Sequence, residues 1–391
     1  MASHRVGSLA ERLITMHSFR NDYMEGAHPR VMDALVRTNA EQQIGYTEDS
    51  WCMKARTAIR RAIVDSDSKG ALRKANIAGA ALQVEFVCGG TMANLLCIGA
   101  ALRPWECVIA APDAHINVHE TGAIEGTGHK VLTTDDADGV LTVQGIDAVM
   151  RAHEHGRNHH MVKPRMLYLS LATEFGAVFT AKQLSDLRSY ADKNDLLIFI
   201  DGARLACGLA SEECDLTLAD VCAAADAFTV GGTKNGSLFG EAIVIRNPAI
   251  QRDFKYYMKQ RGAILAKGRL LGVQFATLFD TAGTAAGIEE AQGDEAMYFS
   301  MGRHSIEAAA RLKNVLVRHG YDTFASNSST NQLFLLLDND TADDFIRAFD
   351  ADLTARPDAS HTIVRMTCSW ATTQNDIDEV DRMLAGATNE A

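Results

Sequence analysis

Two short stretches contain residues whose types and spacing could carry chemistry. Lys234 follows a short apolar run within the sequence FTVGGTKNG, and Asp201 ends the apolar run LLIFI and is followed by GAR. A partly buried lysine gives up its proton more easily and can form a Schiff base. An acid at the carboxyl end of a strand can keep a pyridine nitrogen protonated. Together the two stretches predict a pyridoxal phosphate (PLP) site.

Each stretch also has a plain structural explanation when it is taken alone. Lys234 could be a loop lysine beside a turn, and Asp201 could simply cap a helix. Gly231, Gly232 and Gly236 would leave room for a flat cofactor against the backbone. The order of the two stretches, each after an apolar run typical of a buried strand, favours the cofactor interpretation.

Two stretches upstream fit the same site. Gly90 and Thr91 stand between a strand-like run, residues 83–88, and an apolar helix, the arrangement that binds phosphate at a helix N-terminus. His115 and His119 follow the apolar strand-like residues 107–111. A histidine there could stack on a cofactor ring or act as a base, or it could be an ordinary surface or core histidine.

Basic residues give weaker signals. Five cations lie within the fifteen residues 255–269, including Lys259 and Lys267, and form either a solvated helix face or a contact with a phosphate or a partner subunit. Arg365 lies in a strand-like run, so it needs an anion, either a ligand or an internal salt bridge. The histidines of residues 151–163 have no zinc-binding spacing, and we predict no metal.

Composition sets broad limits. The 391 residues are 47% hydrophobic, enough for a large core, and the net charge of -12 argues against a nucleic-acid or anionic-membrane partner. The eight cysteines form no Cys-x-x-Cys pair, which is typical of reduced thiols in the cytoplasm. We see no apolar signal core and no run long enough to span a bilayer, and we expect a soluble, cytoplasmic protein.

The element pattern predicts an α/β fold. Strand-like and helix-like runs alternate through residues 83–245, which indicates a mostly parallel mixed sheet covered on both faces. We expect helices around Leu9, from Pro29, and after a cap at Asp49 or Ser50. From residue 276 the pattern changes to long helices and a few strands. We therefore expect an N-terminal arm and a large PLP-binding domain in residues 1–275, and a smaller α+β domain in residues 276–391.

With these residues assembled, the sequence resembles the low-specificity L-threonine aldolases. These are PLP enzymes of the aspartate-aminotransferase-like fold (fold type I), and the resemblance extends from Asp22 to Trp370. It implies that Lys234 forms the Schiff base and that Asp201 contacts the pyridine nitrogen. It also implies that Gly90 and Thr91 bind the phosphate, that His115 stacks on the ring, and that Arg204 lies near the cofactor and the substrate carboxylate.

The resemblance further implies substrate and subunit contacts. Residues expected to face the substrate are Asn21, Tyr46, His119, Glu174, Arg204 and Arg365. Lys259 and Lys267 resemble basic residues that reach a neighbouring subunit's phosphate, within a homotetramer built from dimers that share active sites. Many relatives carry Thr-His-Asn where this chain has Thr173-Glu174-Phe175, and some carry a tyrosine in place of His119, so the substrate's side chain stays open.

The expected reaction is the cleavage of a β-hydroxy-α-amino acid to glycine and an aldehyde. The substrates would be L-threonine, L-allo-threonine and bulkier analogues. Another PLP reaction on the same fold, transamination or β-elimination, stays open because fold does not fix function. A non-catalytic PLP-binding protein is the third alternative. Release of glycine from a β-hydroxy amino acid would separate the three.

Overall fold

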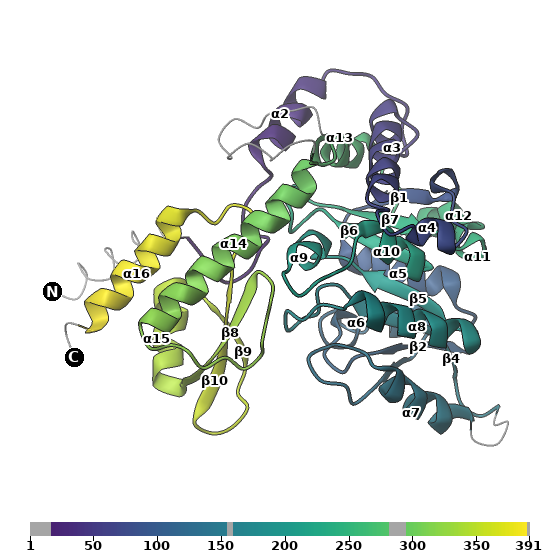
Figure 1. The fold of residues 1–391 in the computed structure, drawn as a ribbon. Helices are drawn as coiled ribbons and strands as arrows, with labels where there is room; N and C mark the ends of the chain where they lie inside the picture. Colours follow the sequence, from purple (N-terminus) through teal and green to yellow (C-terminus); the bar gives the residue numbers. More distant parts are fainter. Residues whose placement is uncertain (1–16, 155–158, 281–294, 389–391) are drawn as a thin grey trace. The chain divides into compact units, whose positions relative to one another are not determined.

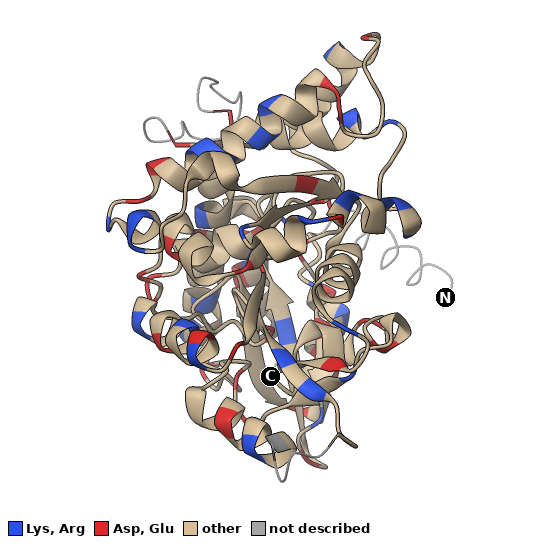
Figure 2. Ribbon diagram, turned by 90° about the vertical axis from the view of Figure 1, so that its right-hand side faces the viewer, with Lys and Arg blue, Asp and Glu red and all other residues tan. Residues whose placement is uncertain are grey.

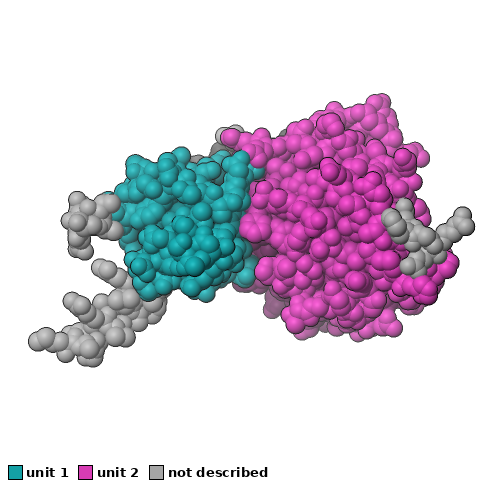
Figure 3. Space-filling view, turned by 90° about the horizontal axis from the view of Figure 1, so that it is seen from below, with its two compact units in different colours: residues 1–25, 304–391 teal, residues 26–303 magenta. Residues whose placement is uncertain are grey.

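The computed structural model describes residues 17–154, 159–280 and 295–388 (Figure 1). The helix expected around Leu9 lies outside these residues. The chain forms two compact units, which Figure 3 colours separately. Residues 26–303 make the large unit, and residues 304–391 with the chain up to Glu25 make the small one. The contacts thus group the N-terminal segment with the C-terminal part of the chain, whereas the sequence predicted a single division after residue 275.

The large unit is built on a seven-stranded sheet of order β1-β7-β6-β5-β4-β2-β3. Strand β7 is antiparallel to both its neighbours, and the pairs from β6 to β3 are all parallel. The prediction of a mostly parallel mixed sheet is therefore confirmed. The strands are β1 (Gln83–Val87), β2 (Glu106–Ala110), β3 (Val131–Thr133), β4 (Lys163–Ser170), β5 (Leu197–Asp201), β6 (Ala227–Gly231) and β7 (Glu241–Ile245).

The central strands are buried along their whole length. Every residue of β2, β5, β6 and β7 is buried, as expected for strands covered by helices on both faces. The register of β4 and β5 pairs Ser170 with Asp201, the last residue of each strand. Because the two strands run in parallel, the segments that follow them leave the sheet at the same edge.

Helices surround this sheet (Figure 1). Helix α5 packs against β1, β5, β6 and β7, while α8 packs against β5. The helices of this part are α2 (Pro29–Thr38), α3 (Ser50–Asp65), α4 (Ala71–Lys74), α5 (Gly90–Ala101), α6 (His115–Val118), α7 (Val143–Glu154), α8 (Ala181–Lys193), α9 (Leu205–Ala210), α10 (Leu218–Ala224), α11 (Pro248–Gln251), α12 (Phe254–Gln260) and α13 (Arg269–Leu278). Helix α14 (Met297–Arg318) begins among the residues of the large unit and ends among those of the small one.

Local sequence explains where several helices begin. Pro29 is the first residue of α2, and the Asp49 carboxylate accepts a hydrogen bond from the Cys52 N–H at the start of α3. Both starts confirm the sequence predictions. Thr180 and Gln183 form a reciprocal capping box at the start of α8.

The small unit contains a three-stranded antiparallel sheet of order β8-β10-β9. Its strands are β8 (Gln332–Asp338), β9 (Asp352–Ala355) and β10 (His361–Thr367), and its further helices are α15 (Asn339–Phe349) and α16 (Gln374–Thr388). The core includes Leu312, Leu335, Phe345 and Val364. This confirms the predicted α+β character, although the short strand β9 was not predicted.

Charged side chains of both signs are interspersed along the helices (Figure 2). Pairs such as Lys182–Asp186 and Arg61–Asp65 join neighbouring turns of one helix. Among the residues that the structure describes, no helix combines the length and the apolar character needed to cross a membrane.

Candidate active site

Asp201 is a buried carboxylate with three hydrogen-bond donors. The Tyr168 hydroxyl donates to Oδ2 over 2.7 Å, Asn94 Nδ2 donates to the same oxygen over 3.1 Å, and the Ala203 N–H donates to Oδ1 over 2.9 Å. Burial, and then the charge of Asp201, raise the pKa of Tyr168 well above its usual range. Tyr168 therefore stays protonated and remains a donor. The half-buried Arg204 follows three residues later and precedes α9.

A second buried carboxylate continues from Asn94 towards His115. Glu120 Oε1 accepts a hydrogen bond from Asn94 Nδ2 over 2.6 Å and lies 2.7 Å from His115 Nδ1. The Glu120 side chain is fully buried, whereas the His115 side chain is 38% exposed. The imidazole is thus held at one edge and keeps accessible surface. These contacts form one chain from Tyr168 through Asp201, Asn94 and Glu120 to His115.

A third carboxylate holds the main chain of His115. Glu174 Oε1 accepts hydrogen bonds from the His115 N–H over 2.9 Å and from Ser170 Oγ over 2.7 Å. Burial raises the pKa of Glu174, while the hydrogen bonds from Ser170 and the backbone oppose that rise. His119 is exposed, and its ring centroid lies 5.5 Å from that of His115. The structure therefore brings together four predicted site residues, Asp201, His115, His119 and Glu174.

Lys234 lies in the nine-residue connection, residues 232–240, between β6 and β7. The N–H groups of Gly232 and Thr233 both donate to the carbonyl oxygen of Gly240, at 3.0 and 3.2 Å. Lys234 directly follows these two residues and is half-buried. Its backbone is therefore fixed by the returning chain.

The glycines beside Lys234 lie where the backbone leaves no space for a side chain or has a positive φ. A β-carbon at Gly231 would lie 2.5 Å from the carbonyl oxygen of Ala203, and one at Gly232 would lie 2.8 Å from that of Gly240. Gly236 has a φ of +84°, which favours glycine. Close approach of this chain's own backbone explains the glycines at 231 and 232, and the positive φ explains the glycine at 236.

Glu241 is a buried acid beside Lys234 that the sequence analysis missed. It is the first residue of β7 and pairs with Gly231 of β6. Burial, with a further contribution from Asp201, raises the pKa of Glu241 well above its usual range, and the charge of Lys234 opposes this. Glu241 Oε2 has no hydrogen-bond partner among the described residues.

The N-terminus of α5 leaves space that an anion could fill. A β-carbon at Gly89 or Gly90 would meet nothing within 4 Å, and no side chain caps the first turn of this twelve-residue helix. Thr91 is exposed beside them. Free backbone N–H groups and the helix dipole both favour a phosphate at such a position.

Tyr46, Lys259 and Lys267 form a second group of predicted residues, all exposed. The Tyr46 N–H donates to the carbonyl oxygen of Ala266 over 3.2 Å, and Lys259 Nζ lies 4.3 Å from the centroid of the Tyr46 ring. The loop of Tyr46 therefore packs on the segment that carries the two lysines.

Two predicted substrate residues belong to the small unit. Arg365 Nη2 pairs with Asp352 Oδ2 at 2.9 Å, so the salt bridge foreseen as an alternative for this arginine exists. Asn21 is buried, and its side-chain oxygen accepts from the Tyr23 N–H over 3.0 Å. Among the described residues of the whole chain, no three His, Cys, Asp or Glu side chains form a metal-binding group.

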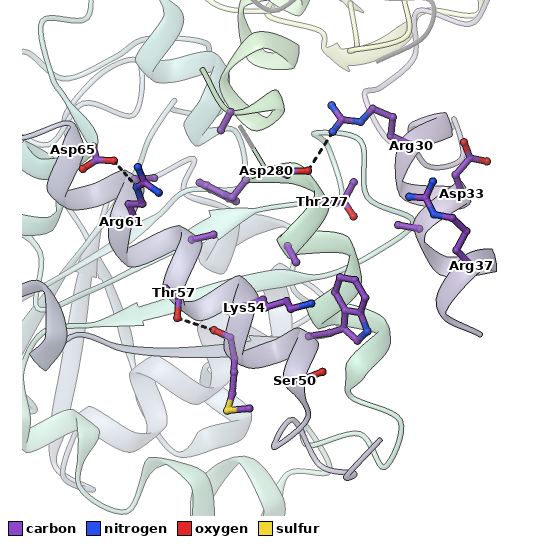
Figure 4. A pocket seen from close by; sticks show the side chains of 18 of the residues that line it. Arg30, Asp33, Arg37, Ser50, Lys54, Thr57, Arg61, Asp65, Thr277 and Asp280 are labelled. Carbon is purple, nitrogen blue, oxygen red and sulfur yellow. Dashed lines mark hydrogen bonds and ion pairs between the residues drawn. The ribbon is translucent and has the colours of Figure 1, made fainter. Parts of the chain in front are cut away.

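A cavity of about 1440 Å³ lies elsewhere in the large unit, between α2, α3 and α13 (Figure 4). Charged side chains line it, and two ion pairs, Arg30–Asp280 and Arg61–Asp65, are visible in Figure 4. Its lining includes none of the predicted site residues. We therefore do not assign the reaction to it.

The sequence model of the beta-eliminating lyases matches residues 18–339. A solved threonine aldolase from Leishmania major is 38% identical, with a TM-score of 0.84 over 95% of this chain and 99% of that chain. This chain belongs to the beta-eliminating lyase family, and within it to the threonine aldolases. The low-specificity L-threonine aldolases of a Pseudomonas species and of Pseudomonas aeruginosa are each 29% identical, covering 67% and 65% of this chain and 71% and 68% of their own lengths.

More distant structures are similar in fold. An aspartate aminotransferase from Thermus thermophilus is 14% identical with a TM-score of 0.64, covering 98% of this chain and 95% of that chain. At this identity the likeness concerns architecture only. It confirms the predicted aspartate-aminotransferase-like fold of this threonine aldolase family member.

Proposed function

We propose that this chain is a PLP-dependent aldehyde-lyase that cleaves β-hydroxy-α-amino acids to glycine and an aldehyde. L-threonine, L-allo-threonine and bulkier analogues are the proposed substrates. The observation that carries the proposal is the 38% identity to the Leishmania major threonine aldolase over almost the full length of both chains. The distant aminotransferase shares only the fold, so nothing specific favours transamination.

The residues of the large unit fit PLP. The open space at Gly89 and Gly90 on the first turn of α5 suits the phosphate, with Thr91 beside it. Asp201 is a buried acid suited to a protonated pyridine nitrogen, and Lys234 would bind the cofactor covalently. PLP, when bound, supplies an electron sink for the bond that breaks.

The side chains around this position have separate proposed tasks. Arg204 would orient the substrate carboxylate, and the accessible imidazole of His115 would lie against the cofactor ring and receive a proton. His119 and Glu174 would meet the substituent on Cβ. Arg365 and Asn21 stay proposed substrate contacts on the family resemblance alone.

We further propose a homotetramer built from dimers with shared active sites, in the cytoplasm. Support for subunit contacts comes from apolar side chains exposed on one pair of helices and the following loops: Met32, Val36, Ile44, Tyr46, Met53 and Val64. These side chains lie on α2, on α3 and on the loop between them, and a contiguous apolar surface of this kind is typical of a subunit interface. Lys259 and Lys267 would reach the partner's cofactor phosphate. All eight cysteines are free thiols, which suits a reducing compartment.

The test is direct. Purified holoenzyme is incubated with L-threonine, L-allo-threonine and a bulkier β-hydroxy amino acid, without any keto acid, and glycine and aldehyde are quantified. We expect equal amounts of the two products from each substrate and none with Lys234→Ala. Absence of glycine, together with transamination products once a keto acid is added, would overturn the proposal.

A further inference from the structure

We propose that Glu120 is a positioning residue that fixes the proton of neutral His115 on Nδ1 and thereby leaves Nε2 as the proton acceptor. This assignment goes beyond the proposed function, and it rests on that function only for the identity of the proton, which is that of the substrate's β-hydroxyl.

Glu120 Oε1 lies 2.6 Å from Asn94 Nδ2 and 2.7 Å from His115 Nδ1. With Glu120 ionised, its oxygens only accept hydrogen bonds, and both neighbours then donate to it. The orientation of the Asn94 amide is unambiguous, because the atom near Glu120 also contacts Asp201 Oδ2 at 3.1 Å. Both partners are carboxylates, so this atom is the amide nitrogen, which donates to both. In that state His115 carries its proton on Nδ1, and the short distances are typical of bonds assisted by charge.

The position of the Glu120 side chain is fixed by its surroundings. Its side chain is fully buried, and Asn94 holds it to Asp201, which Tyr168 holds in turn. The Oε2 atom of Glu120 is buried without a hydrogen-bond partner among the described residues, so the two contacts at Oε1 are the ones that stabilise this buried carboxylate. Of the groups in contact with His115, Glu174 binds only its main-chain N–H, and His119 lies at the ring with a centroid distance of 5.5 Å. Glu120 is the carboxylate that meets the imidazole itself.

The consequence for the reaction concerns one proton. The β-hydroxyl O–H bond breaks and its proton moves to Nε2. The electron pair of that bond forms the second carbon–oxygen bond of the aldehyde, while the electron pair of the Cα–Cβ bond stays with the glycine fragment. His115 then carries a positive charge that the adjacent Glu120 stabilises, as the acid of a catalytic triad does for its histidine.

The first experiment determines, in the absence of substrate turnover, which ring nitrogen of His115 carries the proton. Nitrogen-15 NMR of histidine-labelled holoenzyme is recorded at a pH where His115 is neutral, with His115→Phe to assign the signal. We expect the Nδ1–H tautomer in wild type and a shift towards Nε2–H in Glu120→Ala. Glu120→Gln should keep the Nδ1–H form, because its amide oxygen still accepts. Nε2–H in wild type, or an unchanged tautomer in Glu120→Ala, would overturn the assignment.

The second experiment measures the effect of Glu120 on kcat and KM. With the cofactor still bound, Glu120→Ala should lower kcat by about ten- to a hundredfold, as for other residues that orient a functional histidine, and change KM little. Glu125→Ala removes an exposed carboxylate five residues away and is the matched control, with kcat unchanged. If Glu120→Ala does not fold, the kinetics of Glu120→Gln test the role instead. Loss of the negative charge should still lower kcat. An unchanged kcat would refute the role.

Failure of the positioning role can be distinguished from failure of the proposed function. If no β-hydroxy amino acid yields glycine while the tautomer still depends on Glu120, the aldolase proposal falls and the positioning role stands. If glycine is released at an undiminished rate by Glu120→Ala, the aldolase proposal stands and the positioning role falls.

Discussion

The Tyr168 hydroxyl donates a hydrogen bond of 2.7 Å to the Oδ2 atom of Asp201, inside the sheet. The two residues lie on neighbouring parallel strands, and both are buried. Because burial keeps Tyr168 protonated, this donor is present at every pH at which the enzyme would work. Asp201 is therefore anchored by a side chain that cannot change its role with pH.

Tyr168→Phe should lower both stability and activity. The change removes one of three donors to a buried carboxylate and leaves the ring in place, so we expect the free energy of unfolding to fall by about 1.5–3 kcal/mol. Tyr190→Phe is the control, since Tyr190 donates over 2.9 Å to Asp147. Urea denaturation should register a loss in both variants, but kcat should fall only in Tyr168→Phe. Equal kcat in the two variants would argue against any role of Tyr168 in the site.

Lys234→Ala should abolish the covalent link between protein and cofactor. Lys234 follows β6, and its charge lowers the pKa of the buried Glu241, so the two groups lie close together. Borohydride reduction followed by peptide mass spectrometry should find the cofactor on Lys234 in wild type. Lys182→Ala, at an exposed ion pair, should behave as wild type. Reduced cofactor on any other lysine of the wild-type chain would disprove the assignment.

Asp201→Asn should preserve the fold and lower kcat by about a hundredfold or more, since one fixed charge at a reacting group is typically worth that much. Asp226→Asn is the matched control. Asp226 is another buried acid, but its partners are Arg188 and the Ile198 N–H. We expect Asp226→Asn to lose stability and keep kcat. Near-normal turnover by Asp201→Asn would refute the role in cofactor activation.

Glu241 should make stability depend on pH. Burial raises the pKa of Glu241 above its ordinary value of 4.5, so the folded protein binds this proton more tightly than the unfolded chain does. The stability that protonated Glu241 contributes is complete below pH 4.5 and is lost as the pH rises through the raised pKa. The free energy of unfolding of wild type, minus that of Glu241→Gln, should therefore decrease as the pH increases. A difference that does not vary with pH would contradict this expectation.

Hybrid oligomers should recover activity if active sites are shared. Lys234→Ala lacks the reactive amine, while Lys259→Ala would lack the proposed contact with a partner's phosphate and the contact with Tyr46. Mixing the two inactive proteins and allowing subunits to exchange should restore part of the wild-type rate. Analytical ultracentrifugation should show an oligomer at assay concentrations, and a fully active monomer would rule out sharing.

Sequence reasoning predicted those features that local pattern determines. Asp49 caps α3 because its side chain reaches the N–H three residues on, and β5 and β6 are continuous apolar runs because helices cover them. Lys234 and Asp201 could be singled out because each follows such a run. All of these signals lie within a few residues of the feature that they predict.

The supporting residues of the site could not be predicted in this way. Asn94 and Asp201 are separated by 107 residues, and Tyr168 and Asp201 by 33, so their hydrogen bonds depend on the strand order rather than on any motif. Glu120 had one available signal, its place directly after His119. The close approach of the Ala203 and Gly240 carbonyl groups to the glycines around Lys234 was not predicted, because the sequence does not reveal which backbone segments meet.

The contacts of Glu174 matter for any attempt to change the range of aldehydes that this protein accepts. Its carboxylate accepts hydrogen bonds from the His115 main chain and from Ser170, so a mutation there should alter the geometry of the imidazole as well as the proposed contact with the substrate. His119 is exposed and lies beside the same ring. A mutagenesis library directed first at His119 would vary the substrate side while the anchors of His115 stay in place, and Glu174 would be varied only in combination with a compensating change at Ser170.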